Sequence, residues 1–315
     1  MFSGATDLVA APVYNFILQK LNGRITMLTK EYVDFSRALE AGITAAHAAA
    51  AILQAYSHNR SDLVIDHKSR NDLVSQADRD AESTILQHLQ ELTPEFGIVA
   101  EESGGKPAGT ASWYIDPLDG TTNFLHGIPH YAVSLGLIAH AGTRLSADSE
   151  PLERDTPIVS IVYDPCREEL FTAIYQEGAR LNGERIYCST AQTLSDSLLA
   201  TGVPFRDFSF ENQYMPTFDA AMHTTRGIRR LGAAALDLAW VACGRFDAYW
   251  EMGLAPWDVA AGTLLVREAG GTAEDMYGLE PWPVGGYVAA ANKKVYPELL
   301  AMLRPHLTAP TPKKE

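Results

Sequence analysis

Two aspartates separated by two residues, Asp116 and Asp119, are the side chains of this sequence best placed to do chemistry together. They follow the apolar residues 113–115, which predict a short buried strand, so both acids lie where that strand ends. Pro117 stiffens the backbone between them, because proline fixes its own φ and keeps the preceding residue extended. Two carboxylates held close together need a cation, and hard divalent cations prefer oxygen ligands.

The residues that follow Asp119 could hold an anion and orient water. Gly120 allows a sharp turn or a close approach to a ligand, and the polar residues 121–123 are suited to capping a helix. A helix that starts here would direct its N–H groups and positive dipole end toward the acids, which suits a phosphate group. The Thr121 hydroxyl could orient a water molecule. Alone, Asp-Pro-x-Asp-Gly is explained equally well as an ordinary acidic turn.

Three more acids follow or begin predicted elements. Glu101 and Glu102 follow an apolar strand at 97–100, and Glu251 follows an aromatic strand end. Asp258 lies in the first turn of a helix that begins at Pro256 and ends at a Gly-Gly pair. Each has a plain structural explanation as well, as solvent-facing charge or as a helix cap.

Two helices are predicted before these acids. Residues 32–56 are rich in alanine and leucine, with apolar residues at helical spacing, which predicts a long helix in close packing contact with its neighbours. Ser75 is a plausible N-cap for a second helix, with Asp78 in its first turn. His47, in the first helix, is more simply explained as a packed or solvated residue than as a ligand.

The rest of the chain predicts one antiparallel sheet followed by a mixed second half. Strands are predicted over residues 131–139, 158–163, 170–175 and 178–183. Between the first two of these, residues 141–156 form a long polar loop. Short strands at 198–201 and 227–231 then precede a helix that begins at Gly232, Ala233 and Ala234.

Composition limits the classes of function. The chain has 315 residues and 46% hydrophobic content, enough for one sizeable domain or two closely packed ones. Its formal charge is −14 and it has no run of basic residues, which disfavours general nucleic-acid binding. Cys166, Cys188 and Cys243 fit no disulfide or zinc spacing, which favours a reducing, cytoplasmic setting. Residues 1–29 form an extension of unknown role that resembles neither a signal peptide nor a membrane span.

The stretch 116–124, Asp-Pro-Leu-Asp-Gly-Thr-Thr-Asn-Phe, resembles the first signature of the inositol monophosphatase family of magnesium-dependent, lithium-sensitive phosphatases. The Trp-Asp-x-Ala-Ala and Glu-Ala-Gly-Gly segments within 257–271 resemble its second signature. Further blocks at 68–78, at 101–103 and from Gly232 to Glu251 extend the resemblance over roughly residues 30 to 305. Ser75, Ala100 and Ala233 depart from it, because the family usually has Thr, Gly, and Ser or Thr at these positions.

The resemblance implies a set of site residues. It implies catalytic roles for Glu101, Asp116 and Thr121, with Lys68 and Asp78 near the metal cluster. The implied metal ligands are Glu101, Asp116, the carbonyl of Leu118, Asp119 and Asp258. The implied substrate contacts are Leu118, Asp119, Gly120, Thr121, Gly232, Ala233, Ala234, Glu251 and Asp258. An all-oxygen ligand set favours Mg²⁺ over zinc, and the resemblance implies two or three ions in each site.

The resemblance also predicts the architecture and the reaction. We expect a layered αβαβα sandwich, with an α+β half at 30–185 and an α/β half at 186–315 that form one catalytic unit. The implied protein is a homodimer that hydrolyses myo-inositol monophosphate, without a membrane partner. One alternative is a sugar, histidinol or nucleotide phosphatase of the same superfamily, such as a fructose-1,6-bisphosphatase. Another is a regulatory binding protein that retains the fold and contacts transcription or RNA-processing machinery.

Overall fold

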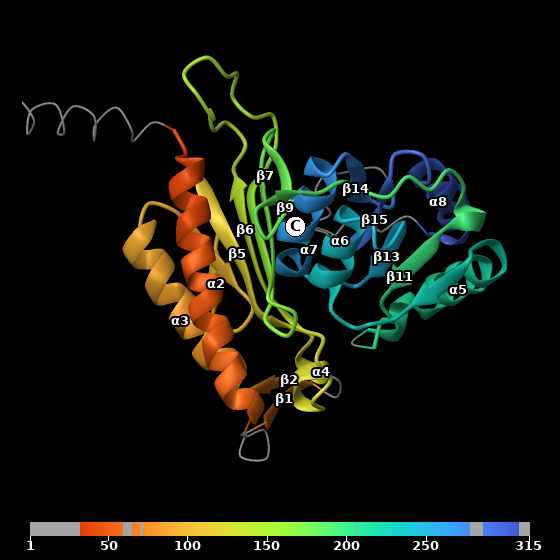
Figure 1. The fold of residues 1–315 in the computed structure, drawn as a ribbon, viewed down its shortest axis with the longest axis horizontal. Coiled ribbons are helices and arrows are strands. Elements are labelled where there is room, and N and C mark those ends of the chain that lie inside the picture. The colour runs from red at the N-terminus through yellow and green to blue at the C-terminus, as the bar shows by residue number, and fades with distance from the viewer. Residues whose placement is uncertain (1–31, 59–64, 70–71, 206, 278–285, 309–315) are drawn as a thin grey trace, which may run out of the picture.

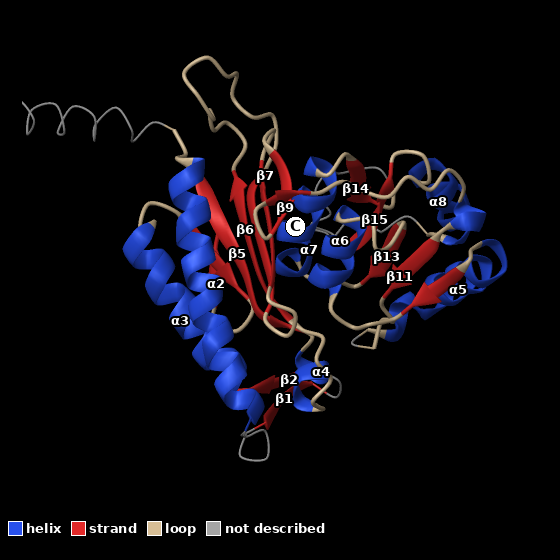
Figure 2. Ribbon diagram, viewed as in Figure 1, coloured by secondary structure: helices blue, strands red, loops and turns tan. Residues whose placement is uncertain are grey.

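Two large β-sheets, of eight and five strands, alternate with three layers of helices across the described part of the molecule (Figures 1 and 2). The predicted αβαβα sandwich is therefore confirmed. The computed structural model describes residues 32–58, 65–69, 72–205, 207–277 and 286–308, with the backbone alone at 65–69 and 72–74. The predicted extension 1–29 lies outside the described residues. Within them, every helix is too short or too polar to cross a lipid bilayer.

The first helical layer consists of α2 (Phe35–His58) and α3 (Gln76–Leu92), which cover one face of the first sheet (Figure 1). The buried stripe of α2 is almost entirely alanine, and these small side chains let α3 and the sheet approach closely. The hairpin of β1 (Ile65–Ser69) and β2 (Asp72–Ser75) joins the two helices. The predicted cap of α3 is confirmed, because Ser75 Oγ accepts from Ala77 N at 3.2 Å and Asp78 accepts from Ser75 N at 2.9 Å.

The first sheet has eight strands in the order β10-β9-β8-β7-β6-β5-β3-β4. They are β3 (Gly97–Ala100), β4 (Gly104–Lys106), β5 (Ala111–Asp119), β6 (Ala132–Ala139), β7 (Thr156–Asp164), β8 (Glu169–Ile174), β9 (Gly178–Leu181) and β10 (Glu184–Arg185). β3 and β5 are parallel, and every other neighbouring pair is antiparallel. The predicted polar loop is the connection 140–155 between β6 and β7.

β5 corrects the prediction that the strand ends before Asp116. It continues to Asp119, with an irregularity in its pairing with β6. Asp116 lies opposite Ser134 and Asp119 opposite Ala132, so β5 contains one more residue than β6 over this interval. Proline is tolerated at such a bulge because it has no N–H to contribute to the ladder. The bulge at Pro117 therefore brings the two acids to the sheet edge without ending the strand.

The middle layer consists of α6 (Ala234–Ala242) and α7 (Pro256–Glu268). Residues 258–266 of α7 are all buried, as expected for a helix with a sheet on each side. The second sheet has the order β12-β11-β13-β15-β14. Its strands are β11 (Leu198–Thr201), β12 (Gly227–Arg229), β13 (Ala248–Met252), β14 (Gly271–Asp275) and β15 (Tyr287–Asn292).

The outer helical layer consists of α5 (Glu211–Thr224) and α8 (Tyr296–Leu303), on the far face of the second sheet (Figure 1). Four short elements complete the described chain. They are α4 (Thr121–Leu125), η2 (Leu194–Asp196), η3 (Phe208–Phe210) and η4 (Arg304–His306).

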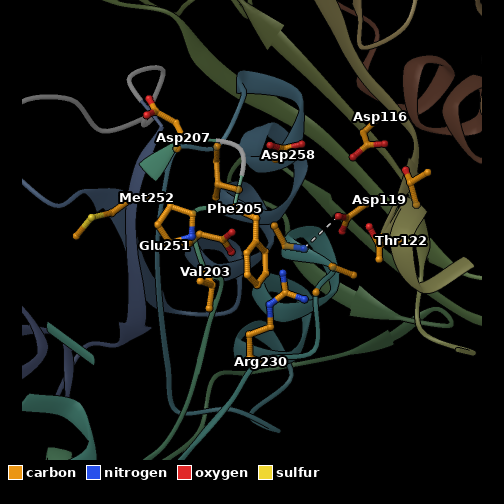
Figure 3. A pocket seen from close by; sticks show the side chains of 18 of the residues that line it. Asp116, Asp119, Thr122, Val203, Phe205, Asp207, Arg230, Glu251, Met252 and Asp258 are labelled. Atoms are coloured by element: carbon orange, nitrogen blue, oxygen red, sulfur yellow. Dashed lines mark hydrogen bonds between the residues drawn. The ribbon is translucent and has the colours of Figure 1, made fainter. Parts of the chain in front are cut away.

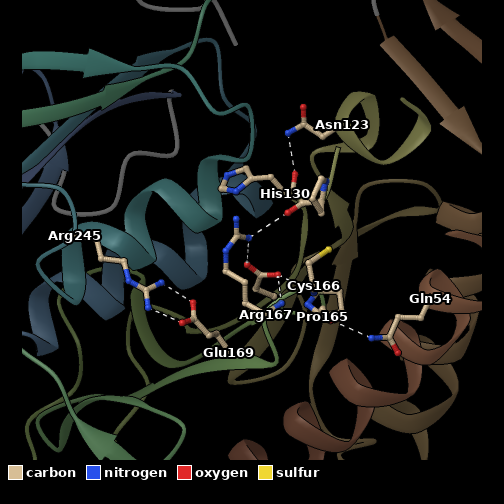
Figure 4. Close-up of polar contacts among 10 residues, drawn as sticks. Gln54, Asn123, His130, Pro165, Cys166, Arg167, Glu169 and Arg245 are labelled. Carbon is tan, nitrogen blue, oxygen red and sulfur yellow. Dashed lines mark hydrogen bonds and ion pairs between the residues drawn. The ribbon is translucent and has the colours of Figure 1, made fainter. Parts of the chain in front are cut away.

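Charged side chains tie the first sheet to α6 (Figure 4). Arg167, in the β7–β8 turn, pairs with Asp164 at 2.7 Å, and Arg245 pairs with Glu169. Both guanidinium groups lie 5.2 Å from the centre of the Trp240 ring, so this indole lies between two cations. The Arg245–Glu169 pair and the contact of Arg167 with Trp240 therefore link the two halves of the chain.

The close contact between β6 and α7 predicts a mutation that loosens the middle layer. A Cβ on Gly136 would lie 2.7 Å from Ala260 Cβ and 2.8 Å from Ala261 N, which is backbone and cannot move aside alone. Gly136→Ala should therefore lower the free energy of unfolding by about 1–3 kcal/mol in urea titrations. Gly227→Ala is the control, because its nearest new contact would be 3.6 Å away. Equal stability of the two variants would contradict the close packing.

Candidate active site

A pocket of about 210 Å³ brings together the residues that the sequence singled out (Figure 3). Every predicted ligand and substrate contact lines it, from the first sheet, the start of α6, the end of β13 and the start of α7. These residues are Glu101, Asp116, Leu118, Asp119, Gly120, Thr121, Gly232, Ala233, Ala234, Glu251 and Asp258. The side chain of Lys68 lies outside what the structure describes.

The parallel pairing of β3 with β5 places Glu101 beside Asp116. Ala100 is in register with Ile115, and Glu101 N donates to Ile115 O at 3.1 Å. Because parallel strands end at the same edge of a sheet, the next residue of each strand carries its acid to that edge. Asp116 is 2% exposed, and its Oδ1 accepts from Leu118 N at 2.9 Å.

Thr121 is the first residue of α4, two residues after Asp119 in the chain. Gly120 precedes it with φ +95°, and a Cβ there would lie 3.0 Å from His130 O, so the turn requires glycine. Thr121 Oγ1 lies 3.1 Å from Asp78 Oδ1 and 3.0 Å from Leu118 O, and its one proton can go to either. Asp78 is held in turn by Ser75, whose Oγ donates to Asp78 Oδ2 at 2.5 Å.

Asp119 joins the two halves of the chain. Its Oδ1 accepts from Ala234 N at 3.1 Å and its Oδ2 accepts from Ala235 N at 2.7 Å, both at the N-terminus of α6 (Figure 3). An anion is favourable at this position because the first N–H groups of a helix have no intrahelical partner. Asn123 supports the contact, since its Nδ2 donates to His130 O and to Leu231 O, both at 2.8 Å.

Asp258 and Glu251 complete the far wall of the pocket. Asp258, in the first turn of α7, accepts from Ala255 N at 2.7 Å and is 8% exposed. Glu251 accepts from the Tyr249 hydroxyl at 2.5 Å. Gly202 lies against the Glu251 carboxyl, where a Cβ would overlap it.

Burial and mutual repulsion shape the electrostatics of the pocket. Burial, and then the charges of Glu101, Asp119 and Asp258, raise the pKa of Asp116 well above its usual value. Burial raises the pKa of Asp119 to about 6, against the two N–H donors of α6, and raises that of Glu251 to about 7. Crowded acids of this kind are stabilised by a cation.

The acids share the pocket without forming a ready-made ligand cage. Among the described residues, no three His, Cys, Asp or Glu side chains are arranged to hold a metal ion. The donor set still suits a hard cation, because all the predicted ligand atoms are oxygens and Asp116 Oδ2 accepts no hydrogen bond from the described residues.

Sequence reasoning missed several residues at or near this pocket. Glu82 and Asp237 are buried acids on α3 and α6, at 2% and 1% exposure. Burial, followed by the charges of Glu251 and Asp119, raises the pKa of Asp237 well above its usual value. The only available signal was their helical spacing, since an acid stands in each case among apolar residues of the buried face.

The mouth of the pocket is also aromatic and basic, which the sequence did not indicate. Phe205 is 45% exposed, and the Arg230 guanidinium lies 4.9 Å from the centre of its ring. Val203, Pro204 and Phe210 extend this apolar wall opposite the acids.

Comparison with known proteins gives one consistent result. The model of the "Inositol monophosphatase family" matches residues 34–308. The Nus factor SuhB of Pseudomonas aeruginosa is 43% identical over 263 residues, which cover 80% of this chain and 90% of that protein. The Nus factor SuhB of Escherichia coli is 42% identical over 244 residues, which cover 76% of this chain and 86% of that protein.

Solved structures agree with the sequence matches. The extragenic suppressor protein suhB from Bartonella henselae superimposes with a TM-score of 0.76 and 37% identity, covering 85% of this chain and 98% of that one. An inositol monophosphatase from Anabaena superimposes with a TM-score of 0.74 and 35% identity, covering 87% and 97%.

The raised pKa of Glu251 predicts a stability change with pH in the metal-free protein. Its neutral form contributes stability that is complete below the unfolded value of 4.5 and is lost as the pH rises through about 7. Glu251→Gln keeps an acceptor for Tyr249 and avoids this loss. Relative to the parent, it should gain about 1–3 kcal/mol between pH 5 and pH 8 in urea titrations with EDTA. Glu91→Gln, at an exposed position of α3, should show no such trend. A flat Glu251→Gln difference would contradict the buried charge.

Proposed function

Because the chain belongs to the inositol monophosphatase family, we propose that it is a magnesium-dependent phosphomonoesterase that hydrolyses myo-inositol monophosphate to inositol and phosphate. Members of this family are in general magnesium-dependent phosphatases. The observation that carries the proposal is the shared pocket, in which acids from chain positions as distant as Glu101 and Asp258 lie with Thr121.

The proposed metal ligands are Glu101, Asp116, Leu118 O, Asp119 and Asp258. The negative charge that raises the pKa of Asp116 is what a divalent cation would neutralise, and the pocket offers oxygens alone. We propose two or three Mg²⁺ ions. When bound, Mg²⁺ would neutralise the phosphate and stabilise the charge that develops on the leaving oxygen.

The remaining roles follow from the hydrogen bonds around the acids. When Thr121 donates to Asp78, the lone pairs of its Oγ1 can accept a hydrogen bond from the attacking water and orient that water toward phosphorus. The N–H groups of residues 120–122 would hold phosphate oxygens. The Glu251 carboxylate, oriented by Tyr249, would accept a hydrogen bond from a substrate hydroxyl.

Two observations favour testing related phosphate esters as well. Ala233 lines the pocket without the hydroxyl that the family usually has there, so one substrate contact is missing. The stacked pair of Phe205 and Arg230 would suit a leaving group that carries a ring or a second phosphate. A sugar, histidinol or nucleotide phosphatase of the same superfamily is therefore the second candidate.

A regulatory role is the third candidate, and it rests on the names of the relatives. The P. aeruginosa and E. coli proteins are both named Nus factor SuhB. A binding protein that contacts transcription or RNA-processing machinery would not need the catalytic acids, whereas all of them line the pocket here. All three candidates are compatible with the cytoplasmic setting that we propose from the cysteine usage.

A panel of phosphate esters tests the proposed function. With Mg²⁺, we expect release of phosphate from myo-inositol 1-phosphate at a higher kcat/KM than from fructose 1,6-bisphosphate, histidinol phosphate or adenosine phosphates. Excess EDTA should abolish turnover, and added Mg²⁺ should restore it.

Asp258→Asn is the loss-of-function variant for this assay. It should lower kcat by about 100-fold or more, because one ligand charge is lost. Asp219→Asn, at an exposed position of α5, should keep the parent rate. Turnover in excess EDTA would exclude the metal mechanism. A different preferred ester would select the second candidate, and no hydrolysis of any ester would favour the third.

We also propose that the protein is a homodimer, as the family resemblance implies. Each chain has a mass of 34.3 kDa, so light scattering coupled to size exclusion should report about twice that value. A mass of one chain at micromolar concentration would contradict the proposal.

A further inference from the structure

Glu82 is a buried acid on α3 that has no role in the chemistry described above. It lies one helical turn after Asp78, so both side chains point from the same face of α3. Both are only 2% exposed. A carboxyl group buried to this degree is costly unless it is hydrogen-bonded, so its partners show what it does.

The partners of Glu82 are the two residues that follow Glu101. Its Oε2 accepts from Glu102 N and its Oε1 accepts from Ser103 N, both at 2.8 Å. Each carboxylate oxygen of Glu82 thus accepts one backbone N–H, an arrangement that fixes a turn of the backbone. Glu101 N donates in turn to Ile115 O at 3.1 Å. The backbone of Glu101 is therefore held by β5 on one side and by Glu82 on the other.

The β3–β4 turn, residues 101–103, leads to the edge strand of the first sheet. β4 (Gly104–Lys106) is exposed along its length and pairs only with β3, at the edge of the sheet. Gly104 and Gly105, the first two residues of β4, both have positive φ, at 76° and 121°, a conformation that favours glycine. The two hydrogen bonds that the Glu82 side chain accepts therefore restrain the backbone that carries Glu101 after the end of β3.

We propose that Glu82 is a positioning residue that holds the Glu101 carboxylate where it can bind Mg²⁺, an inference that rests on the proposed metal site. α3 then serves the site twice, because Asp78 orients Thr121 and Glu82 orients the segment of Glu101 from one rigid helix. Partners of this kind orient a ligand without touching the metal, and their loss typically weakens metal binding by about 10–100-fold.

Glu82→Gln is the principal variant. Glutamine has similar size but only one acceptor oxygen, and its NH₂ group would face one of the two backbone N–H groups. Calorimetric titration of the substrate-free protein with MgCl₂ should show a dissociation constant about 10–100-fold higher than that of the parent. Glu91→Gln, on the exposed face of the same helix, should bind Mg²⁺ as the parent does.

A double-mutant cycle separates positioning from general loss of structure. If Glu82 acts through Glu101, Glu82→Gln should weaken Mg²⁺ binding by less than about threefold in a Glu101→Gln background. In the metal-free protein, the Glu102 and Ser103 amides should exchange with solvent about tenfold faster or more in Glu82→Gln than in the parent. If Glu82 had only a structural role, Glu82→Gln would speed amide exchange throughout α3. It would also weaken Mg²⁺ binding in the Glu101→Gln background by the same factor as in the parent.

Glu82→Asp keeps the charge but shortens the side chain by one carbon, and it serves as the second variant if Glu82→Gln fails to fold. It should also bind Mg²⁺ at least about fivefold more weakly than the parent, because it cannot reach both N–H groups. Parent-like affinity in whichever variant folds would overturn the proposal while leaving the proposed phosphatase intact. A parent protein that binds no Mg²⁺ would overturn both.

Discussion

The structure depends on one unfavourable interaction, the confinement of several carboxylates in one partly dry pocket. Asp116 experiences burial and the charges of Glu101, Asp119 and Asp258 together, and each of these contributions opposes its ionisation. Crowding of this kind does not stabilise a fold, so the rest of the protein must hold the acids in place against it. It does so with backbone N–H groups, which donate hydrogen bonds to the carboxylates. These groups are fixed dipoles and do not titrate.

The elements that hold the acids are themselves buried, and this explains much of the composition. α7 lies between two sheets, so it can have no polar face, and Asp258 is confined to its first turn. α2 approaches its neighbours through alanines, and β6 approaches α7 through Gly136. Close packing of small residues leaves little freedom for backbone movement. The backbone around the pocket is therefore closely packed, and hydrogen bonds from that backbone hold the acids.

The sequence predicted the features that depend on local patterns. It did not predict the features that depend on a residue far away in the chain. Ser75 and Asp78 could be placed because a capping box is contained within four consecutive residues. The end of β5 could not be predicted in this way, because the bulge is defined by how β5 pairs with β6. Nor could the bonds from Ala234 and Ala235 to Asp119, which require the second half of the chain to pack against the first. Those contacts are also the ones that assemble the pocket.

Dividing the site between two sheets has a consequence for selectivity. The acids around Asp116 belong to the first sheet and to helix starts, where hydrogen bonds determine their positions. The wall that a leaving group would meet belongs to the second half, where Glu251 is the last residue but one of β13 and Phe205 lies in the chain that follows β11. The lack of a side-chain hydroxyl at Ala233, or a change at Phe205, could therefore alter which ester fits without moving the acids. The proposed metal chemistry could then be retained while the substrate changes, because the two sets of residues lie on different elements, which Asp119 joins at the start of α6.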